Sequence, residues 1–143
     1  MKNVVVLSIV LATAGAARAD SLADKKYWKG QMDYVERSLK AGEEACGVKF
    51  TFEWVDKDKL RAEAEKNSNS PNGICTNIID EVVSLCHEGD EDKAAVSKQL
   101  KGFTCGYAKE RTLQVKGGVV KYMGNNQQSN FSSWAKPILE KSL

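Results

Sequence analysis

His87 is the single histidine of this 143-residue chain, which makes it the first residue to consider for acid–base chemistry. It directly follows the last apolar position of a predicted helix, where a cationic side chain stabilises the helix C-terminus. Nucleophilic catalysis would need a nucleophile and an orienting partner beside it. Cys86 is its neighbour in sequence, but adjacent helical positions point apart. The pattern therefore predicts a structural or surface role for His87, and we assign no catalytic residue.

Four cysteines are the next residues with distinctive chemistry. They are Cys46, Cys75, Cys86 and Cys105. Their gaps of 29, 11 and 19 residues contain no close pair, although zinc sites usually bring cysteines in pairs such as C-x₂-C. Covalent haem attachment needs C-x-x-C-H, and Val83 stands where the first cysteine should be. An even number of cysteines in an exported chain indicates two disulfides instead.

The acidic clusters do not predict a metal site or an acid–base pair. The run Glu88–Asp92 lacks the regular spacing of a calcium loop, and negative charge is favourable at the start of the helix that follows. Glu43-Glu44 and Asp80-Glu81 are helical neighbours that do not face each other, so we interpret them as solvated surface. No metal and no cofactor is predicted. Asn130-Phe131-Ser132 fits the glycosylation sequon, a triplet too common to predict glycosylation.

The first 19 residues have the layout of a secretory signal peptide. A basic start is followed by an apolar run over residues 4–14 and by the small-x-small cleavage pattern Ala17-Arg18-Ala19. The run is too short to span a bilayer, which needs about 20 residues. We expect cleavage before Asp20, so that residues 20–143 form a single exported domain, in the periplasm or the extracellular medium.

The mature chain is predicted to carry almost no net charge. Because Lys2 and Arg18 leave with the signal peptide, 19 Lys and Arg residues face 19 Asp and Glu residues. Both signs are interspersed, so composition favours neither nucleic acid nor an anionic membrane surface as a partner. No second segment reaches membrane-spanning length, and stable membrane insertion after cleavage is not expected.

Apolar periodicity predicts about five helices. They cover approximately residues 21–46, 56–66, 72–86, 91–101 and 129–138. Ser21 and Asp24 resemble a capping box, and Gly47 suits the end of the first helix. Asn72 can cap the third helix after a loop over residues 67–73. Pro137 lacks an N–H group, so the last helix is expected to be kinked or short.

Alternating apolar residues predict a strand over residues 48–54 and a later hairpin. Gly117-Gly118 indicates a two-residue turn between the hairpin strands. This turn pairs Val115 with Val120 and Leu113 with Tyr122 on one face, and leaves Thr112, Gln114, Lys116 and Lys121 on the other. We therefore predict an α+β fold with about five helices, two of them in a helical hairpin, and an antiparallel sheet of about three strands.

The predicted helices also select the disulfide pairing. Cys75 and Cys86 are 11 residues apart on one helix, hence about 16 Å apart, whereas a disulfide needs Cα atoms within about 7 Å. The short turn at residues 87–90 makes the flanking helices antiparallel neighbours, which brings Cys105 back beside Cys75. Cys86 remains at the turn with Cys46. The predicted disulfides are therefore Cys46–Cys86 and Cys75–Cys105.

Six aromatic residues could line a ligand groove, but most lie on apolar faces assigned to the core. They are Tyr27, Trp28, Phe50, Phe52, Trp54 and Trp134. Phe52 and Tyr27 are the two aromatic residues that the pattern leaves open to exposure. Core packing is the predicted role of the group as a whole.

The leading functional hypothesis is a small exported binding or interaction module whose partner is another extracytoplasmic protein, and an enzyme is disfavoured. A first alternative is an inhibitor or envelope-stress protein that inserts the loop 67–73 into a partner's active site. A second is an extracytoplasmic hydrolase with an atypical site near His87. A deep pocket with His87 and a carboxylate would favour the hydrolase, and a large exposed apolar patch would favour binding.

Overall fold

The structure is a computed structural model in which residues 21–126 and 129–143 are described. The predicted signal peptide, residues 1–19, and the predicted mature N-terminus at Asp20 lie outside the described residues. The helices are α1 (Leu22–Cys46), α2 (Lys57–Lys66), α3 (Pro71–Glu88), α4 (Asp90–Gln99) and α5 (Phe131–Ser142). The strands are β1 (Thr51–Trp54), β2 (Gly102–Tyr107), β3 (Thr112–Lys116) and β4 (Val119–Gly124). The predicted α+β class is confirmed.

Local chemistry accounts for both ends of α1. Ser21 Oγ accepts a hydrogen bond from the Asp24 N–H at 3.1 Å and donates one to the Asp24 carboxylate at 2.6 Å. Gly47 follows the helix with φ of 74°, a left-handed conformation that suits glycine. Both predicted ends are confirmed because each depends on residues within one helical turn.

The start of α3 differs from the prediction. Ser70, not Asn72, is the N-cap, and its hydroxyl accepts a hydrogen bond from the Gly73 N–H at 3.2 Å. Pro71 occupies the first helical position, where a missing N–H carries no penalty. At the other end, Gly89 alone separates α3 from α4, and the two helices pack together as the predicted helical hairpin.

The sheet corrects the prediction in two respects. It has four strands in the order β1-β2-β4-β3, because the segment 102–107, to which the sequence pattern assigned no element, is the strand β2. It is also mixed and not antiparallel: β1 pairs parallel with β2, and β2 pairs parallel with β4. Two glycines among the six residues of β2 weaken its strand signal. The β3–β4 hairpin has the predicted register, with Val115 opposite Val120 and Leu113 opposite Tyr122.

The glycines of β2 allow β1 to approach closely. A Cβ on Gly102 would lie 2.7 Å from the Thr51 carbonyl oxygen. A Cβ on Gly106 would lie 2.7 Å from the Val55 carbonyl oxygen and 2.9 Å from Met123 Cε. Larger side chains at these positions would therefore force the two strands apart.

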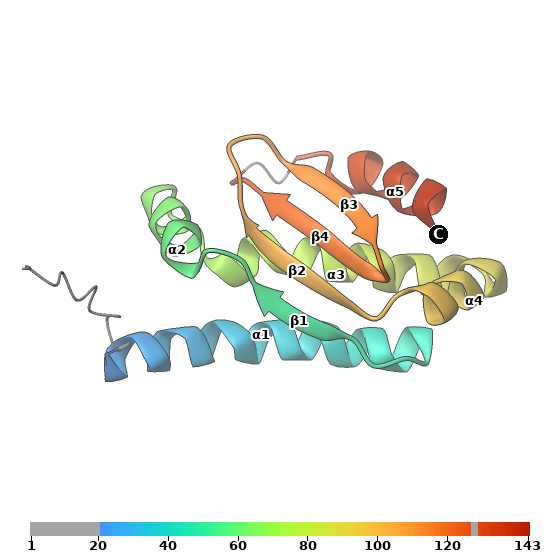
Figure 1. Cartoon of the computed structure of the whole chain (residues 1–143), viewed down its shortest axis with the longest axis horizontal. Coiled ribbons are helices and arrows are strands. Elements are labelled where there is room, and N and C mark those ends of the chain that lie inside the picture. Colours follow the sequence, from blue (N-terminus) through green and yellow to red (C-terminus); the bar gives the residue numbers. More distant parts are fainter. Residues whose placement is uncertain (1–20, 127–128) are drawn as a thin grey trace, which may run out of the picture.

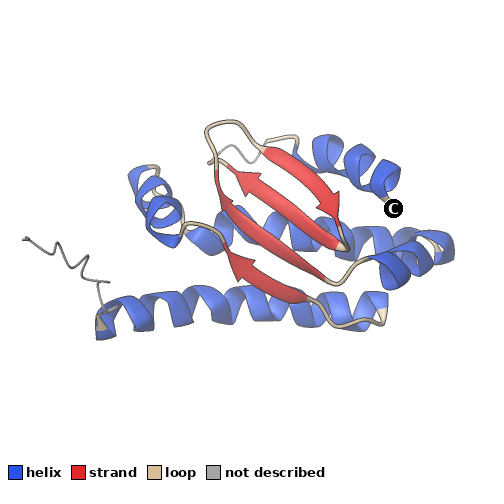
Figure 2. Ribbon diagram, in the orientation of Figure 1, coloured by secondary structure: helices blue, strands red, loops and turns tan. Residues whose placement is uncertain are grey.

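The core lies between the sheet and a layer of helices. Figures 1 and 2 show α1 and α3 behind the strands, α5 beside β3, and α2 and α4 at opposite ends of the sheet. The central helix α3 packs against α1, α4, α5 and the two middle strands. Its predicted apolar stripe is buried except for Val83, which is partly exposed. The helix α5 continues past Pro137 to Ser142, with Ala135 and Leu139 in the core.

Two disulfides cross-link these elements, in the pairing that the sequence predicts. Cys46 at the end of α1 is bonded to Cys86 near the end of α3, with Cα atoms 5.2 Å apart. Cys75 near the start of α3 is bonded to Cys105 in β2, with Cα atoms 5.8 Å apart. Among the described residues, no helix has both the length and the apolar composition needed to cross a bilayer.

Candidate functional site

One face of the sheet is uncovered by helices within the described residues. In Figure 1 the strands lie in front of α1 and α3, and no helix passes in front of the strands. Three neighbouring strands, β1, β2 and β4, are mutually parallel. Parallel strands are usually buried on both faces, so an uncovered face on such strands is the most unusual surface of this fold.

The strand register defines which side chains share the uncovered face. In the order β1, β2, β4, β3, its three rows are Thr51–Gly102–Val119–Lys116, Glu53–Thr104–Lys121–Gln114 and Val55–Gly106–Met123–Thr112. Glu53 is the single carboxylate of these rows, and no ion pair involving Lys116 or Lys121 is found among the described residues. The face therefore presents a fully polar central row between two outer rows that contain its three apolar side chains, Val119, Val55 and Met123.

An aromatic cluster lies at one edge of this sheet, between α1 and β1. The rings of Trp28 and Trp54 are 5.3 Å apart, and those of Phe52 and Trp54 are 4.7 Å apart. Tyr27 contacts Trp28 edge-on at 5.3 Å, and Lys57 lies over the Trp28 ring at 5.5 Å. The rings of Trp28, Phe52 and Trp54 are half-buried against the core, and Tyr27 is half-buried beside them. The cluster anchors β1 on α1 and leaves part of its apolar surface in contact with solvent.

Arg61 connects α2 to the same cluster. Its guanidinium stacks 4.0 Å from the centre of the Tyr27 ring and forms ion pairs with Asp24 at 2.9 Å and Glu65 at 2.8 Å. Hydrogen bonding to Ser21, and then to Arg61, holds the pKa of Asp24 below its usual value. Burial raises the pKa of the Tyr27 phenol. These contacts fix α2 to the start of α1.

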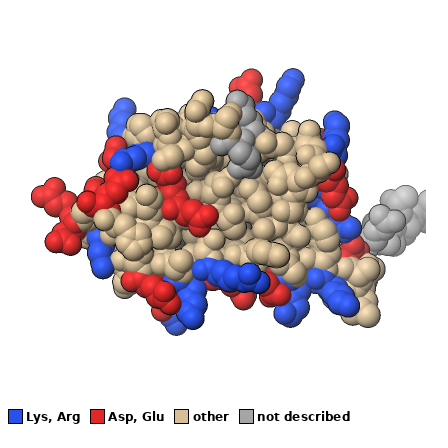
Figure 3. Space-filling view, turned by 180° about the vertical axis from the view of Figure 1, so that it is seen from behind, with Lys and Arg blue, Asp and Glu red and all other residues tan. Residues whose placement is uncertain are grey.

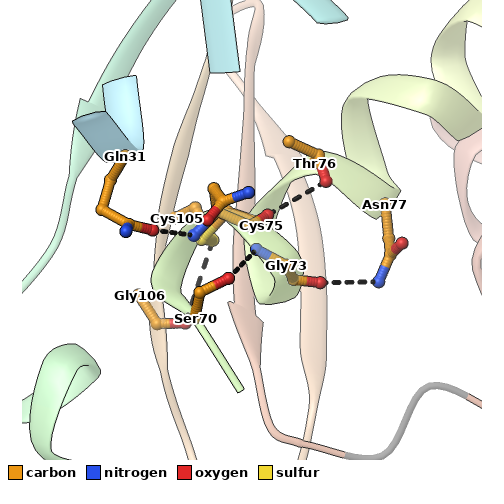
Figure 4. Close-up of a disulfide and its surroundings, with 9 residues drawn as sticks. Gln31, Ser70, Gly73, Cys75, Thr76, Asn77, Cys105 and Gly106 are labelled. Atoms are coloured by element: carbon orange, nitrogen blue, oxygen red, sulfur yellow. Dashed lines mark hydrogen bonds between the residues drawn. A yellow bond between two sulfur atoms is a disulfide. The ribbon is translucent and has the colours of Figure 1, made fainter. Parts of the chain in front are cut away.

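The start of α3 is closed by internal hydrogen bonds. Figure 4 shows Gln31 reaching from α1 towards the disulfide between Cys75 and Cys105. Gln31 Oε1 accepts from the Asn72 N–H at 3.1 Å, and Ser70 accepts from the next two amides of the helix. The first-turn amides that often bind anions are therefore already satisfied.

His87 is exposed in the last turn of α3. Its neighbour Cys86 is held in a disulfide, and no hydrogen bond or ion pair of His87 is found within the described residues. Asp90 and Asp92 lie in the first turn of α4, as the dipole argument predicts. Among the described residues, no group of His, Cys, Asp and Glu side chains could hold a metal ion.

Asp80 and Glu81 face different helices. Asp80 lies on the side of α3 that faces Ser38 of α1, and burial raises the pKa of its carboxyl. Glu81 is buried and accepts a hydrogen bond from Ser132 of α5 at 2.9 Å. The prediction that both carboxylates are solvated is wrong for Glu81, because α5 covers that side of α3. Glu43 and Glu44 are exposed as predicted.

A further contact missed from the sequence involves β4 and α5. The buried Tyr122 ring contacts Phe131 at 5.4 Å and Trp134 at 6.2 Å, and Arg111 stacks 4.6 Å above Trp134. Burial raises the pKa of Tyr122 to about 12. These residues are far apart in sequence, and no local pattern indicates that they meet.

Comparison of the chain with known protein families, with characterised proteins and with solved structures gave no match. The functional argument therefore depends on the uncovered sheet face and on the compartment that the disulfides indicate.

Proposed function

We propose that the protein is a small exported binding module that presents the uncovered face of its sheet to another protein outside the cytoplasm. The observation that carries this proposal is the uncovered face over parallel strands, since parallel strands normally have both faces covered. The central row of that face supplies the groups for recognition, namely Thr104, Lys121 and Gln114 beside Glu53.

The compartment is supported independently. Two disulfides point to an oxidising environment, because cytosolic thiols are kept reduced. The signal-peptide pattern of residues 1–19 agrees with export. The mass of the exported protein tests this part of the proposal. We expect a chain that begins at Asp20, and a retained N-terminal segment would contradict the proposal.

The inhibitor alternative has less support. The connection between α2 and α3 covers residues 67–70 and is tied to both helices. Asn67 Nδ2 donates to the Glu63 carbonyl at 2.9 Å, and Ser70 caps α3. A loop this short and this well bonded is poorly suited to enter a partner's active site.

A capture experiment tests the proposed surface. The wild-type protein on a resin is compared with Lys121→Glu, which reverses a charge at the middle of the uncovered face. Lys40→Glu makes the same change on the exposed surface of α1 and is the matched control. We expect a protein of the native compartment that binds the wild type and Lys40→Glu but not Lys121→Glu. Equal capture by all three would contradict the sheet face as the binding site.

A further inference from the structure

The strand β1 has a free edge. It ends the sheet, and β2 occupies one of its two sides. The Thr51 N–H donates to the Lys101 carbonyl just before β2 at 3.0 Å, and the Val55 N–H donates to the Cys105 carbonyl of β2 at 2.7 Å. By the alternation of the ladder, the N–H and C=O groups of Phe52 and Trp54 point to the opposite side, where no hydrogen-bond partner is found among the described residues. These four groups form a template for another strand.

The two edges of the sheet are not equivalent. The other edge strand, β3, has α5 packed against it, whereas β1 contacts α1 through the rings of Trp28 and Trp54. At the β1 edge, the half-buried rings of Phe52, Trp54 and Trp28 are bordered by the exposed charges of Lys49 and Glu53. An apolar centre with a charged rim is the usual composition of an interface between protein chains.

We infer that β1 pairs antiparallel with β1 of a second copy, with the two-fold axis at Phe52. Phe52 then faces Phe52 of the second copy, and the outward main-chain groups of both strands are bonded. The two sheets join into one continuous sheet. Its uncovered face would be twice as wide, but the proposed function does not depend on this pairing.

The charges of Glu53 in β1 and of Lys49, two residues before β1, select this register. With the axis at Phe52, Glu53 lies opposite Thr51 of the second copy, and the right-handed twist brings it closer to Lys49 of that copy than to its Glu53. An axis at Glu53 would also bond Phe52 and Trp54, but it would place the two Glu53 carboxylates directly opposite each other. Like charges in that position are unfavourable.

The same charges favour a second copy over a foreign strand. Lys49 and Glu53 have opposite signs and lie four residues apart, so an antiparallel copy of this segment places each of them near an opposite charge. The ion pair that Lys49 forms within its own chain, with Glu43 at 3.8 Å, is exposed and can be exchanged for this contact. A foreign strand whose charges all had the same sign would place a like charge beside either Lys49 or Glu53. A four-residue strand is small beside the roughly 800 Å² per partner of a stable interface, so we expect a dissociation constant of micromolar or weaker.

Sedimentation equilibrium of the purified protein, from about 10 µM to 1 mM, measures this association. We expect a monomer–dimer equilibrium that Lys49→Glu weakens about tenfold, since two symmetric ion pairs become repulsions. The double variant Lys49→Glu/Glu53→Lys restores the pairs with reversed signs and should recover the wild-type affinity. Lys116→Glu reverses a lysine on the other edge strand and should have no effect. Lys49, Glu53 and Lys116 are all exposed, so the variants should fold.

Amide hydrogen exchange identifies the edge directly. The N–H groups of Phe52 and Trp54 should become protected as concentration rises, whereas the inward N–H of Glu53 should be protected at every concentration. A wild-type monomer at 1 mM would overturn the inference, and so would a dimer that Lys49→Glu does not weaken. If the N–H groups of Phe52 and Trp54 became protected only when a captured partner was added, the dimer would be ruled out, and the edge would bind a strand of another protein. None of these results affects the capture experiment with Lys121→Glu. The dimer and the binding function of the sheet face can therefore each be contradicted while the other stands.

Discussion

The helix side and the sheet side of this protein use polar side chains differently. Between the helices, Gln31 binds the start of α3, Ser132 binds Glu81, and Lys136 binds Glu88. Figure 3 shows the helix side, where Lys and Arg lie mainly towards the outline, while some Asp and Glu atoms lie near the middle among otherwise uncharged residues. On the uncovered sheet face, no hydrogen bond between two side chains is found within the described residues. Polar groups with internal partners hold the fold, whereas those without partners remain available to a ligand.

The largest expected effect comes from breaking the covalent link between the two sides. Cys75→Ala/Cys105→Ala opens a loop of 30 residues and should lower the free energy of unfolding by about 3–4 kcal/mol. Urea denaturation measures the loss. Cys46→Ala/Cys86→Ala, which joins helix to helix, should cost a similar amount without loosening the sheet. A loss below about 1 kcal/mol for the first pair would show that packing alone holds the sheet on α3.

The second effect depends on pH and concerns Tyr122, whose ring lies between sheet and helices. An unfolded tyrosine ionises near pH 10, whereas burial raises the pKa of Tyr122 in the folded protein to about 12. The folded state therefore binds the Tyr122 proton more tightly than the unfolded state. The contribution of Tyr122 to the free energy of unfolding is complete below pH 10 and is lost between pH 10 and 12, by up to about 2–3 kcal/mol. Unfolding followed against pH should show a smaller loss for Tyr122→Phe. Tyr34→Phe, at an exposed position, should behave like the wild type.

The third effect tests the close approach of β1 and β2 under the uncovered face. A Cβ at Gly106 would lie 2.7 Å from the Val55 carbonyl oxygen, so Gly106→Ala should destabilise the protein by about 1–3 kcal/mol. The control is Gly30→Ala in α1, where nothing lies within 4 Å of the new methyl group. This change should stabilise the protein by about 0.5–1 kcal/mol. If the two variants melted at the same temperature, the strand contact would not be tight.

The fourth effect concerns the bond between α3 and α5. Ser132→Ala removes the hydroxyl that donates to the buried Glu81 carboxylate, and a hydrogen bond to a charged group contributes about 1.5–3 kcal/mol. Because Ser132 is itself exposed, water can replace part of the bond, and we expect about 1 kcal/mol. Thermal unfolding of Ser133→Ala, an exposed neighbour, provides the reference. Equal stability of both variants would mean that the hydrogen bond from Ser132 to Glu81 does not stabilise the fold.

The smallest effect is expected at His87. His87→Ala should change stability by less than about 0.5 kcal/mol and leave partner capture intact, since the side chain is exposed. Capture and unfolding assays on the same preparation measure both. A folded variant that had lost an assayed activity would restore the hydrolase alternative.

About half of the candidate surface could be predicted from the sequence. Lys121, Gln114 and Lys116 were expected on the outer face because the Gly117-Gly118 turn sets the hairpin register. Thr104 was missed together with β2, since a strand with two glycines has little apolar alternation. The burial of Glu81 was missed for a related reason: α5, which covers it, lies fifty residues further along the chain.

The sequence by itself determined the features that depend on neighbouring residues: the caps of α1, the hairpin turn, the apolar stripe of α3 and, through the length of that helix, the cysteine pairing. The tertiary structure decided the strand order, the parallel pairs and the uncovered face. Those features depend on which distant segments share main-chain hydrogen bonds, and β2 becomes a strand because β1 and β4 bind it from both sides. Backbone groups of every residue type form these bonds, so side-chain pattern alone carries little information about them.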